Sequence, residues 1–329
     1  MKSRVVVLFL AVPLAFAAGH RVVQIIPLPG ENGSGALLVD AAARRLYVGQ
    51  NNRLLVLDIE SGRQLAAIDD LPAIAGIAVA PSIDRGYVTS STDNRVSIFA
   101  LSNFGHLGQI PLGADPEALV YDSTAHRFYA MNRGSKNASA IDADDGEVEE
   151  TIDLGGRPAG AVANDHGRVF VALEDRSEIV EIDAKRMAFS RRWPIPDCEA
   201  PHGLALDDSR NRLFIGCAKQ RLAIVNANDG TIIGIAATGR GGGDIATDPS
   251  SGFVYLANTD GSITVFSEAS TGKYETVETV PTQQGATALA FDSRTHQLFT
   301  LLPSHGAARP AGNEEREQPS TSQLLVIGR

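Results

Sequence analysis

A short apolar run, a polar turn and a second apolar run recur seven times along the chain. The second run always holds an aromatic residue seven positions after an anchor residue. The aromatic residues lie 40 to 44 positions apart: Tyr47, Tyr87, Tyr129, Phe170, Phe214, Tyr255 and Phe299. The anchors are Asp40, Ala80, Asp122, Ala163, Asp207, Asp248 and Asp292. A repeat of about 40 residues is typical of propeller blades with four strands.

Each repeat has room for four strands. Residues 76–79, 128–130 and 138–142 exemplify the first three strands, and residues 152–155 exemplify the fourth. The runs are short, and Gly, Asp and Asn separate them, as is typical of strands and turns. An Asp anchor suits the first turn because its carboxylate can accept backbone N–H groups there. We therefore predict an all-β protein, a seven-bladed β-propeller of four-stranded blades in one domain spanning residues 20–329.

The two ends of the chain predict how the ring closes. Residues 22–30 resemble a fourth strand such as 109–113, and residues 323–327 resemble a third strand. If these segments pair, the N-terminal strand completes the last blade. The alternative is an open array with a loose N-terminal strand. Closure is favoured, because the open array would leave two sheet edges exposed to other chains.

The first residues resemble a secretory signal. Lys2 and Arg4 precede an apolar run from Val5 to Phe16, and small residues follow. We predict a signal peptide over residues 1–18, with cleavage near 17–19. The alternative is a membrane anchor, but the run is shorter than the roughly 20 residues that span a bilayer. The mature chain is then periplasmic or secreted, with no membrane span.

Charge narrows the classes of partner. The formal net charge is −10, with 29 Lys and Arg against 39 Asp and Glu. Removing Lys2 and Arg4 leaves 27 basic residues and a charge near −12. An acidic surface repels phosphate backbones, so we do not expect a nucleic-acid partner.

Several stretches indicate a family. The best are residues 198–207, 212–217 and 280–286, together with the ending 325–329. In these stretches the chain resembles the YVTN-repeat propellers, and over residues 20–329 it resembles the YncE-like secreted bacterial proteins. The resemblance implies a propeller exported from a bacterial cytoplasm. It carries over no catalytic residues, and a propeller fold alone does not define a function.

The chain has two cysteines, Cys198 and Cys217. Cys198 lies in the link between two blades, and Cys217 ends the second strand of the next blade. That link and the loop after the second strand open on the same face, so the two thiols can meet. In an oxidising compartment an even pair favours a disulfide. The alternative is two separate buried thiols.

Polar residues gather where first strands begin and second strands end, which is the predicted mouth of the central channel. The candidate ligand-binding residues are Glu117, Asn132, His202, Asp244 and Asn258. Carboxylates and amides could hold a divalent cation such as Ca²⁺, since hard cations take oxygen ligands. The alternative is an ordinary wet channel mouth. His202 follows a proline at a strand start, which is more typical of a structural or ligand-contacting residue than of a metal ligand.

No catalytic signature stands out in the sequence. The glycine-rich segment 239–243 falls in a link between blades, with no helix behind it to hold a phosphate. We expect a monomeric, non-catalytic binding or scaffold propeller whose loop face engages an envelope protein, a peptide or a small ligand. The alternative is a metal-dependent hydrolase of the lactonase type, with a cation in the channel. A polar insertion at 303–320 lies on the same face, as a tolerated surface loop or as a lid.

Overall fold

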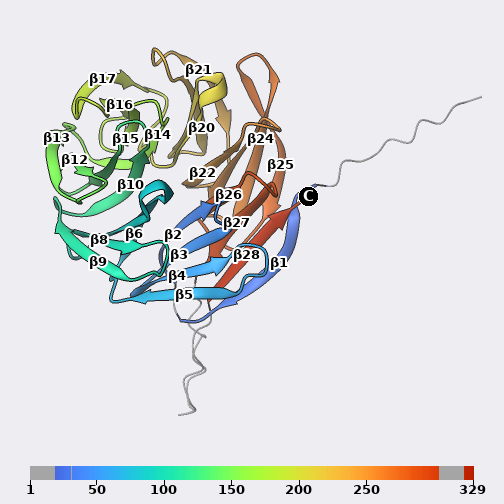
Figure 1. Cartoon of the computed structure of the whole chain (residues 1–329). Coiled ribbons are helices and arrows are strands. Elements are labelled where there is room, and N and C mark those ends of the chain that lie inside the picture. The colour runs from blue at the N-terminus through green and yellow to red at the C-terminus, as the bar shows by residue number, and fades with distance from the viewer. Residues whose placement is uncertain (1–18, 31, 304–321) are drawn as a thin grey trace, which may run out of the picture.

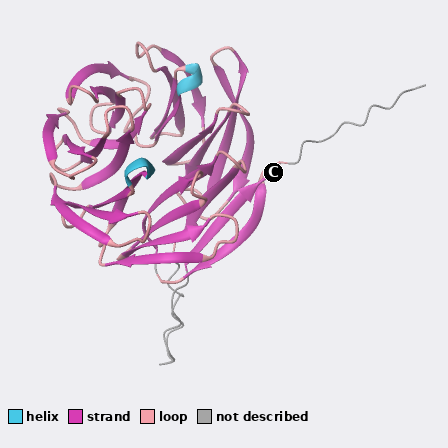
Figure 2. Cartoon of the chain, viewed as in Figure 1, coloured by secondary structure: helices cyan, strands magenta, loops and turns pink. Residues whose placement is uncertain are grey.

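The chain forms a ring of seven four-stranded antiparallel sheets around a central axis (Figure 1). The computed structural model describes residues 19–30, 32–303 and 322–329. Strands dominate this part, with two short 3-10 helices, η1 (Pro81–Ile83) and η2 (Asp208–Arg210) (Figure 2). The predicted fold class, a seven-bladed propeller, is confirmed.

Each blade places its strands in chain order from the axis outward, and the blades are numbered here in that order. The innermost strands are β2 (Asn32–Asp40), β6 (Ile74–Ala80), β10 (Pro116–Asp122), β14 (Pro158–Ala163), β18 (Leu204–Asp207), β22 (Gly242–Asp248) and β26 (Leu289–Asp292). The second strands are β3 (Arg45–Gln50), β7 (Arg85–Ser90), β11 (Arg127–Asn132), β15 (Arg168–Leu173), β19 (Arg212–Cys217), β23 (Phe253–Asn258) and β27 (Gln297–Leu302). The third strands are β4 (Arg53–Asp58), β8 (Arg95–Ala100), β12 (Asn137–Asp142), β16 (Glu178–Asp183), β20 (Arg221–Asn226), β24 (Ser262–Ser270) and β28 (Ser322–Gly328). The outer strands are β5 (Gln64–Asp69), β9 (His106–Pro111), β13 (Val148–Asp153), β17 (Ala188–Pro194), β21 (Ile232–Ala237), β25 (Lys273–Pro281) and, from the N-terminus, β1 (Arg21–Leu28).

The N-terminal strand closes the ring, as predicted. β1 pairs antiparallel with β28, with Ile25 opposite Leu325 and one irregularity between Val22 and Gln24. Blade 7 therefore has the order β1-β28-β27-β26. The innermost strands contact their neighbours all the way round, including β26 with β2. Pairing by backbone hydrogen bonds thus joins the two ends of the described chain in one blade.

The repeated aromatic residues form the core between blades. All seven are buried, none with more than 1% of its surface exposed. The hydroxyl of Tyr129 donates to the carbonyl of Ala184 in the next blade at 2.5 Å, and that of Tyr87 donates to Ala143 at 3.3 Å. In blades 2 and 3 the repeated aromatic residue therefore supplies both apolar filling and a hydrogen bond to the next blade.

The anchors end the first strand and also join blades. Asp122 accepts the backbone N–H of Ala125 at 2.6 Å and that of Gly167 in the next blade at 3.0 Å. The anchor predicted for blade 4, Ala163, is wrong. The residue in that role is Asn164, whose side-chain oxygen accepts from the backbone N–H groups of His166 and Arg168, both at 3.0 Å. The turn of blade 4 is one residue shorter, so counting back from Phe170 misses the anchor by one.

Two predicted features lie outside the described residues. These are the signal peptide at 1–18 and, except for Pro303, the insertion at 303–320. Within the described residues, no helix has the length and apolar character needed to cross a membrane.

Candidate functional site

Three of the predicted site residues lie on innermost strands or directly before one. Glu117 is in β10, Asp244 is in β22, and His202 comes just before β18. Glu117 and His202 both stand five residues before their anchors, so they occupy the same position of the repeat in blades 3 and 5. Their side chains reach solvent, as does that of Asp244. The repeat thus brings these polar groups to one end of the channel.

Close packing of the innermost strands holds the backbones of Glu117 and His202 in place. A Cβ added to Gly76 would lie 2.5 Å from the carbonyl oxygen of Glu117. A Cβ added to Gly160 would lie 2.2 Å from that of His202. Real Cβ atoms do not approach so closely, so only glycine allows these strands to meet.

An ion-pair network spans blades 3 and 4 at the mouth. The Arg133 guanidinium lies 2.6 Å from Glu174, 3.4 Å from Glu117 and 3.7 Å from Asp115. Asp175 continues the network beside Lys136, at 3.6 Å. One cation is therefore shared among three carboxylates.

The two carboxyl groups that face the channel, Glu117 and Asp244, have raised pKa values. Burial raises the pKa of Glu117, although His202 and Arg133 partly oppose the shift. The pKa of Asp244 is also raised, because the surrounding protein partly desolvates its carboxylate. A hydrogen bond from the backbone N–H of Leu289, at 3.1 Å, opposes this second shift. A raised pKa means that ionising these carboxyl groups lowers the stability of the folded protein.

The two predicted asparagines do not face the channel. Asn132 and Asn258 are fully buried. The Asn132 amide donates to Asn137 and Ser139, at 2.7 and 2.9 Å, within its own blade. The Asn258 amide donates to Thr264 at 2.9 Å. Both side chains hold the loop after the second strand, so a ligand at the mouth would not reach them in the intact blade.

The predicted disulfide is present beside the mouth. Cys198 and Cys217 are joined, with a Cα–Cα distance of 5.0 Å. A cavity of about 310 Å³ lies next to this bridge. Cys217, His202 and Glu174 line it, together with small residues including Ala200 and Gly242. The cavity opens beside the polar residues of the channel mouth.

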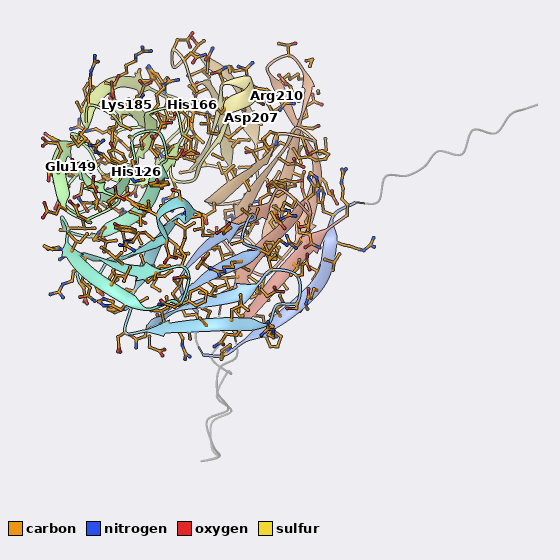
Figure 3. The ribbon with its side chains drawn as sticks, viewed as in Figure 1. His126, Glu149, His166, Lys185, Asp207 and Arg210 are labelled. Atoms are coloured by element: carbon orange, nitrogen blue, oxygen red, sulfur yellow. A yellow bond between two sulfur atoms is a disulfide. The ribbon has the colours of Figure 1, made fainter. Side chains whose placement is uncertain are left out.

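Nothing in the described residues forms a metal centre, since no group of three or more His, Cys, Asp or Glu side chains there has a suitable arrangement. Histidines on the turns between first and second strands make polar contacts with nearby side chains. His126 contacts the Tyr121 hydroxyl at 3.1 Å and Asp144 at 3.2 Å. Figure 3 shows His126, His166 and Arg210 on three successive blades, on turns between first and second strands.

Sequence reasoning missed Glu174 and its neighbour Asp175. The signal was present, because Arg133 and Glu174 each stand four residues after the aromatic residue of their blade. Equivalent positions in adjacent blades lie side by side, so opposite charges there indicate an ion pair. Scanning single residues for ligand types overlooks a pattern that exists only between repeats.

A comparison with protein families shows which family the chain belongs to. The sequence model of the family described as outer membrane protein assembly factor BamB matches residues 106–295, more than half of the chain. The chain belongs to this family. The part matching the BamB family includes Glu117, Arg133, Glu174, His202, Asp244 and both cysteines. A comparison with curated proteins finds no match.

Solved structures agree on the fold. The WD40 repeats of RRP9 share 12% identity with the chain at a TM-score of 0.78, covering 94% of this chain and 98% of that one. U3-55K shares 12% identity at 0.78, covering 93% and 99%. The hydrazine synthase of Kuenenia stuttgartiensis shares 13% identity at 0.70, covering 83% and 92%. These TM-scores show that the BamB-family chain shares the propeller architecture, and identities this low say nothing of its chemistry.

Proposed function

We propose that the protein is a non-catalytic binding propeller of the bacterial cell envelope, which engages an envelope protein or peptide at the channel mouth. One observation carries the proposal. Charged side chains from blades 3 and 4 converge there with His202 of blade 5, beside a cavity of about 310 Å³ lined by His202 and Glu174. Loops on a rigid scaffold are where specificity is usually built.

The electrostatics support a binding role. Glu117 keeps a carboxylate where burial raises its pKa, which is unfavourable for the folded protein at neutral pH. Groups with perturbed pKa values are enriched at functional sites. Arg133 is shared among three carboxylates, so a partner group of either sign can replace one of its ion pairs. Such a mouth suits a polar protein surface.

Three observations support a location outside the cytoplasm. The family is described by a role in outer membrane assembly, the chain contains a disulfide, and its start resembles a signal peptide. Disulfides persist in oxidising compartments such as the periplasm. We propose that the mature protein is periplasmic or secreted and acts as a monomeric, YncE-like YVTN propeller.

Site-specific photo-crosslinking in living cells tests the binding face. A photoreactive amino acid replaces His202 at the mouth or His166, an exposed residue on the turn between β14 and β15. Both are exposed histidines, but they lie at opposite ends of their strands, so His166 is a matched control. We expect a discrete crosslinked envelope protein from position 202 only. That product should weaken when Glu117 and Glu174 are both changed to Gln.

Two results would contradict the proposal. One is the same set of products from positions 202 and 166, which would indicate random encounters. The other is an unchanged product in the double variant, provided that its melting curve matches that of the wild type.

A further inference from the structure

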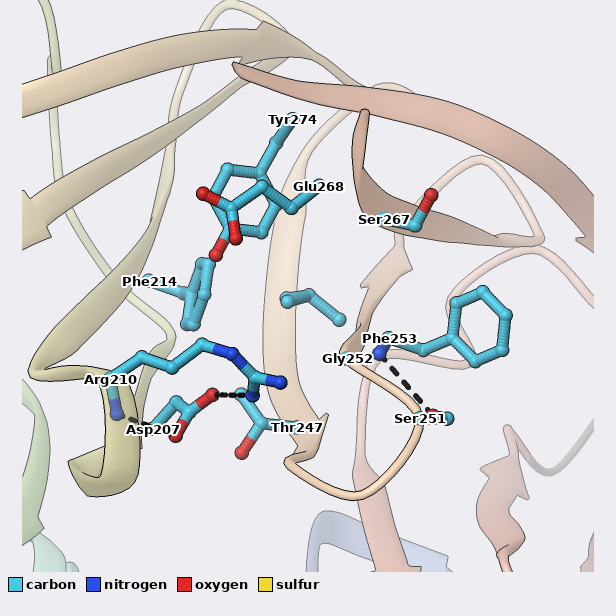
Figure 4. A pocket seen from close by; sticks show the side chains of 11 residues that line it. Asp207, Arg210, Phe214, Thr247, Ser251, Gly252, Phe253, Ser267, Glu268 and Tyr274 are labelled. Atoms are coloured by element: carbon cyan, nitrogen blue, oxygen red, sulfur yellow. Dashed lines mark hydrogen bonds and ion pairs between the residues drawn. The ribbon is translucent and has the colours of Figure 1, made fainter. Parts of the chain in front are cut away.

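Blade 6 departs from the repeat at its outer hairpin. In blades 3, 4 and 5 a buried alanine follows the third strand and packs against the preceding blade: Ala143, Ala184 and Ala227. In blade 6 the strands β24 and β25 are nine residues long, and Glu268 stands at the alanine position. The third strand therefore continues three residues further than the equivalent strand of blade 5, β20. A cavity of about 200 Å³ remains between blades 5 and 6 (Figure 4).

One wall of this inter-blade pocket is aromatic. The rings of Phe214 and Tyr274 meet edge to face, with centroids 5.2 Å apart. Tyr274 is only 8% exposed. Its hydroxyl borders the pocket and has no hydrogen-bond partner among the described residues (Figure 4). The hydroxyl is therefore open to a hydrogen bond with a group that enters the pocket.

The charges in the pocket are unequal. Arg210 extends into the space (Figure 4), but its Nη1 already lies 2.6 Å from Asp207 and donates to the carbonyl of Pro249 at 3.1 Å. Glu268 accepts one bond, from the backbone N–H of Gly272 at 2.6 Å. It makes no ion pair in the part of the chain that the structure describes. Glu268 therefore has no ion-pair partner of its own beside the two aromatic rings, although Arg210 attracts it from across the pocket.

We propose that this pocket binds a lysine side chain presented by a peptide or protein partner. The ammonium group pairs with Glu268 and donates to the Tyr274 hydroxyl, and the methylene stem lies along Phe214. A long side chain with an apolar stem and a charged tip matches this lining. Cations are attracted to aromatic faces, and the acidic chain draws them in over longer distances. An anion would instead meet Glu268 and Asp207.

The pocket is separate from the channel mouth. It is lined by the first turn of blades 5 and 6, with Arg210 and Gly252, whereas the mouth is built from blade links and second-to-third-strand loops. The proposal therefore goes beyond the proposed function and does not depend on it.

An NMR titration of the isotope-labelled full chain tests the proposal. The probe is Nα-acetyl-lysine-N-methylamide, and the reporter is the Gly272 amide that donates to Glu268. We expect a saturable shift of this amide. Changing Glu268→Gln should weaken binding about tenfold, because it removes the negative charge that pairs with the ammonium group and leaves only a neutral hydrogen-bond acceptor. Tyr274→Phe, which removes only the hydroxyl, should weaken it less.

The controls separate lysine recognition from general stickiness. Glu150→Gln on β13 of blade 3 removes an exposed outer-strand carboxylate and should leave the titration unchanged. Nα-acetyl-norleucine-N-methylamide has the stem without the charge and should not saturate. Equal binding of the norleucine probe, unchanged affinity in both pocket variants, or a stronger response to acetate would each overturn the proposal.

Discussion

Single residues in this propeller hydrogen-bond both within their own turn and to the neighbouring blade. Asp248 accepts the backbone N–H of Ser250 at 3.0 Å and the Ser250 hydroxyl at 2.6 Å. Its other oxygen lies 2.9 Å from Nδ1 of His296 in blade 7. Burial alone would raise the pKa of Asp248, but these bonds outweigh it and lower the pKa to about 2. The charged form is thus part of the joint between blades 6 and 7.

We predict that Asp248→Asn destabilises the protein in a pH-dependent way. The folded pKa lies below the unfolded value of about 3.9, so the stabilisation is present above about pH 4 and is lost as the pH falls through about 2. At about pH 7 the variant should lose about 2 kcal/mol of unfolding free energy. Urea unfolding at several pH values measures the difference from the wild type.

Asp93→Asn, in the exposed loop of blade 2, is the control and should change little. An Asp248→Asn deficit that stays constant down to about pH 2 would show that geometry, not charge, is what matters at this joint.

At the scale of elements, one position of the repeat holds the loop after the second strand. It lies three residues after each aromatic: Gln50, Ser90, Asn132, Leu173, Cys217, Asn258 and Leu302. In blades 3 and 6 an asparagine does this by hydrogen bonds. In blade 5 Cys217 does it covalently, through Cys198. The bridge also closes the segment that carries His202.

We predict that replacing both cysteines by alanine costs roughly 3 kcal/mol of unfolding free energy, since the closed segment spans 19 positions. Urea unfolding with and without a thiol reductant measures the cost. The reductant should destabilise the wild type and leave the double variant unaffected. Identical wild-type curves in both conditions would contradict this role for the bridge.

At the scale of the whole molecule, stability depends on closure of the ring. β1 supplies a complete strand to blade 7, and His20, just before it, reaches blade 6. Its Nδ1 lies 2.7 Å from Glu278 and its Nε2 lies 3.2 Å from the Tyr255 hydroxyl. His20 thus takes the place of the backbone carbonyls of blades 3 and 4 that accept from the equivalent tyrosine hydroxyls. Both a sheet and a polar contact therefore seal the last joint.

We predict that deleting residues 20–30 exposes the edge of β28 and causes aggregation or a large loss of melting temperature. His20→Ala, which keeps the strand, should cost only about 1–3 kcal/mol by leaving buried polar groups unpaired. Light scattering and thermal melting compare the two variants. A soluble deletion variant that melts like the wild type would refute closure as a source of stability.

The sequence by itself determined the number of blades, the strand order, the closing strand and the cysteine pair. These depend on spacing along the chain, and a repeat of strands and turns displays that spacing directly. The aromatic residues mark the core because a buried position in one blade is buried in all. Only the family resemblance and the signal peptide rest on other grounds.

The tertiary structure alone decided which polar residues reach the channel. Asn132 and Glu117 looked alike as candidates, yet one is buried in its blade and the other faces the mouth. The Arg133–Glu174 pair, the shorter turn at Asn164 and the pocket beneath Glu268 likewise depend on contacts between blades. Such contacts join residues some 40 positions apart, and side-chain direction, turn length and packing set them. A linear pattern does not record side-chain direction or packing, and it shows the charge match of Arg133 and Glu174 only when equivalent positions of adjacent repeats are compared.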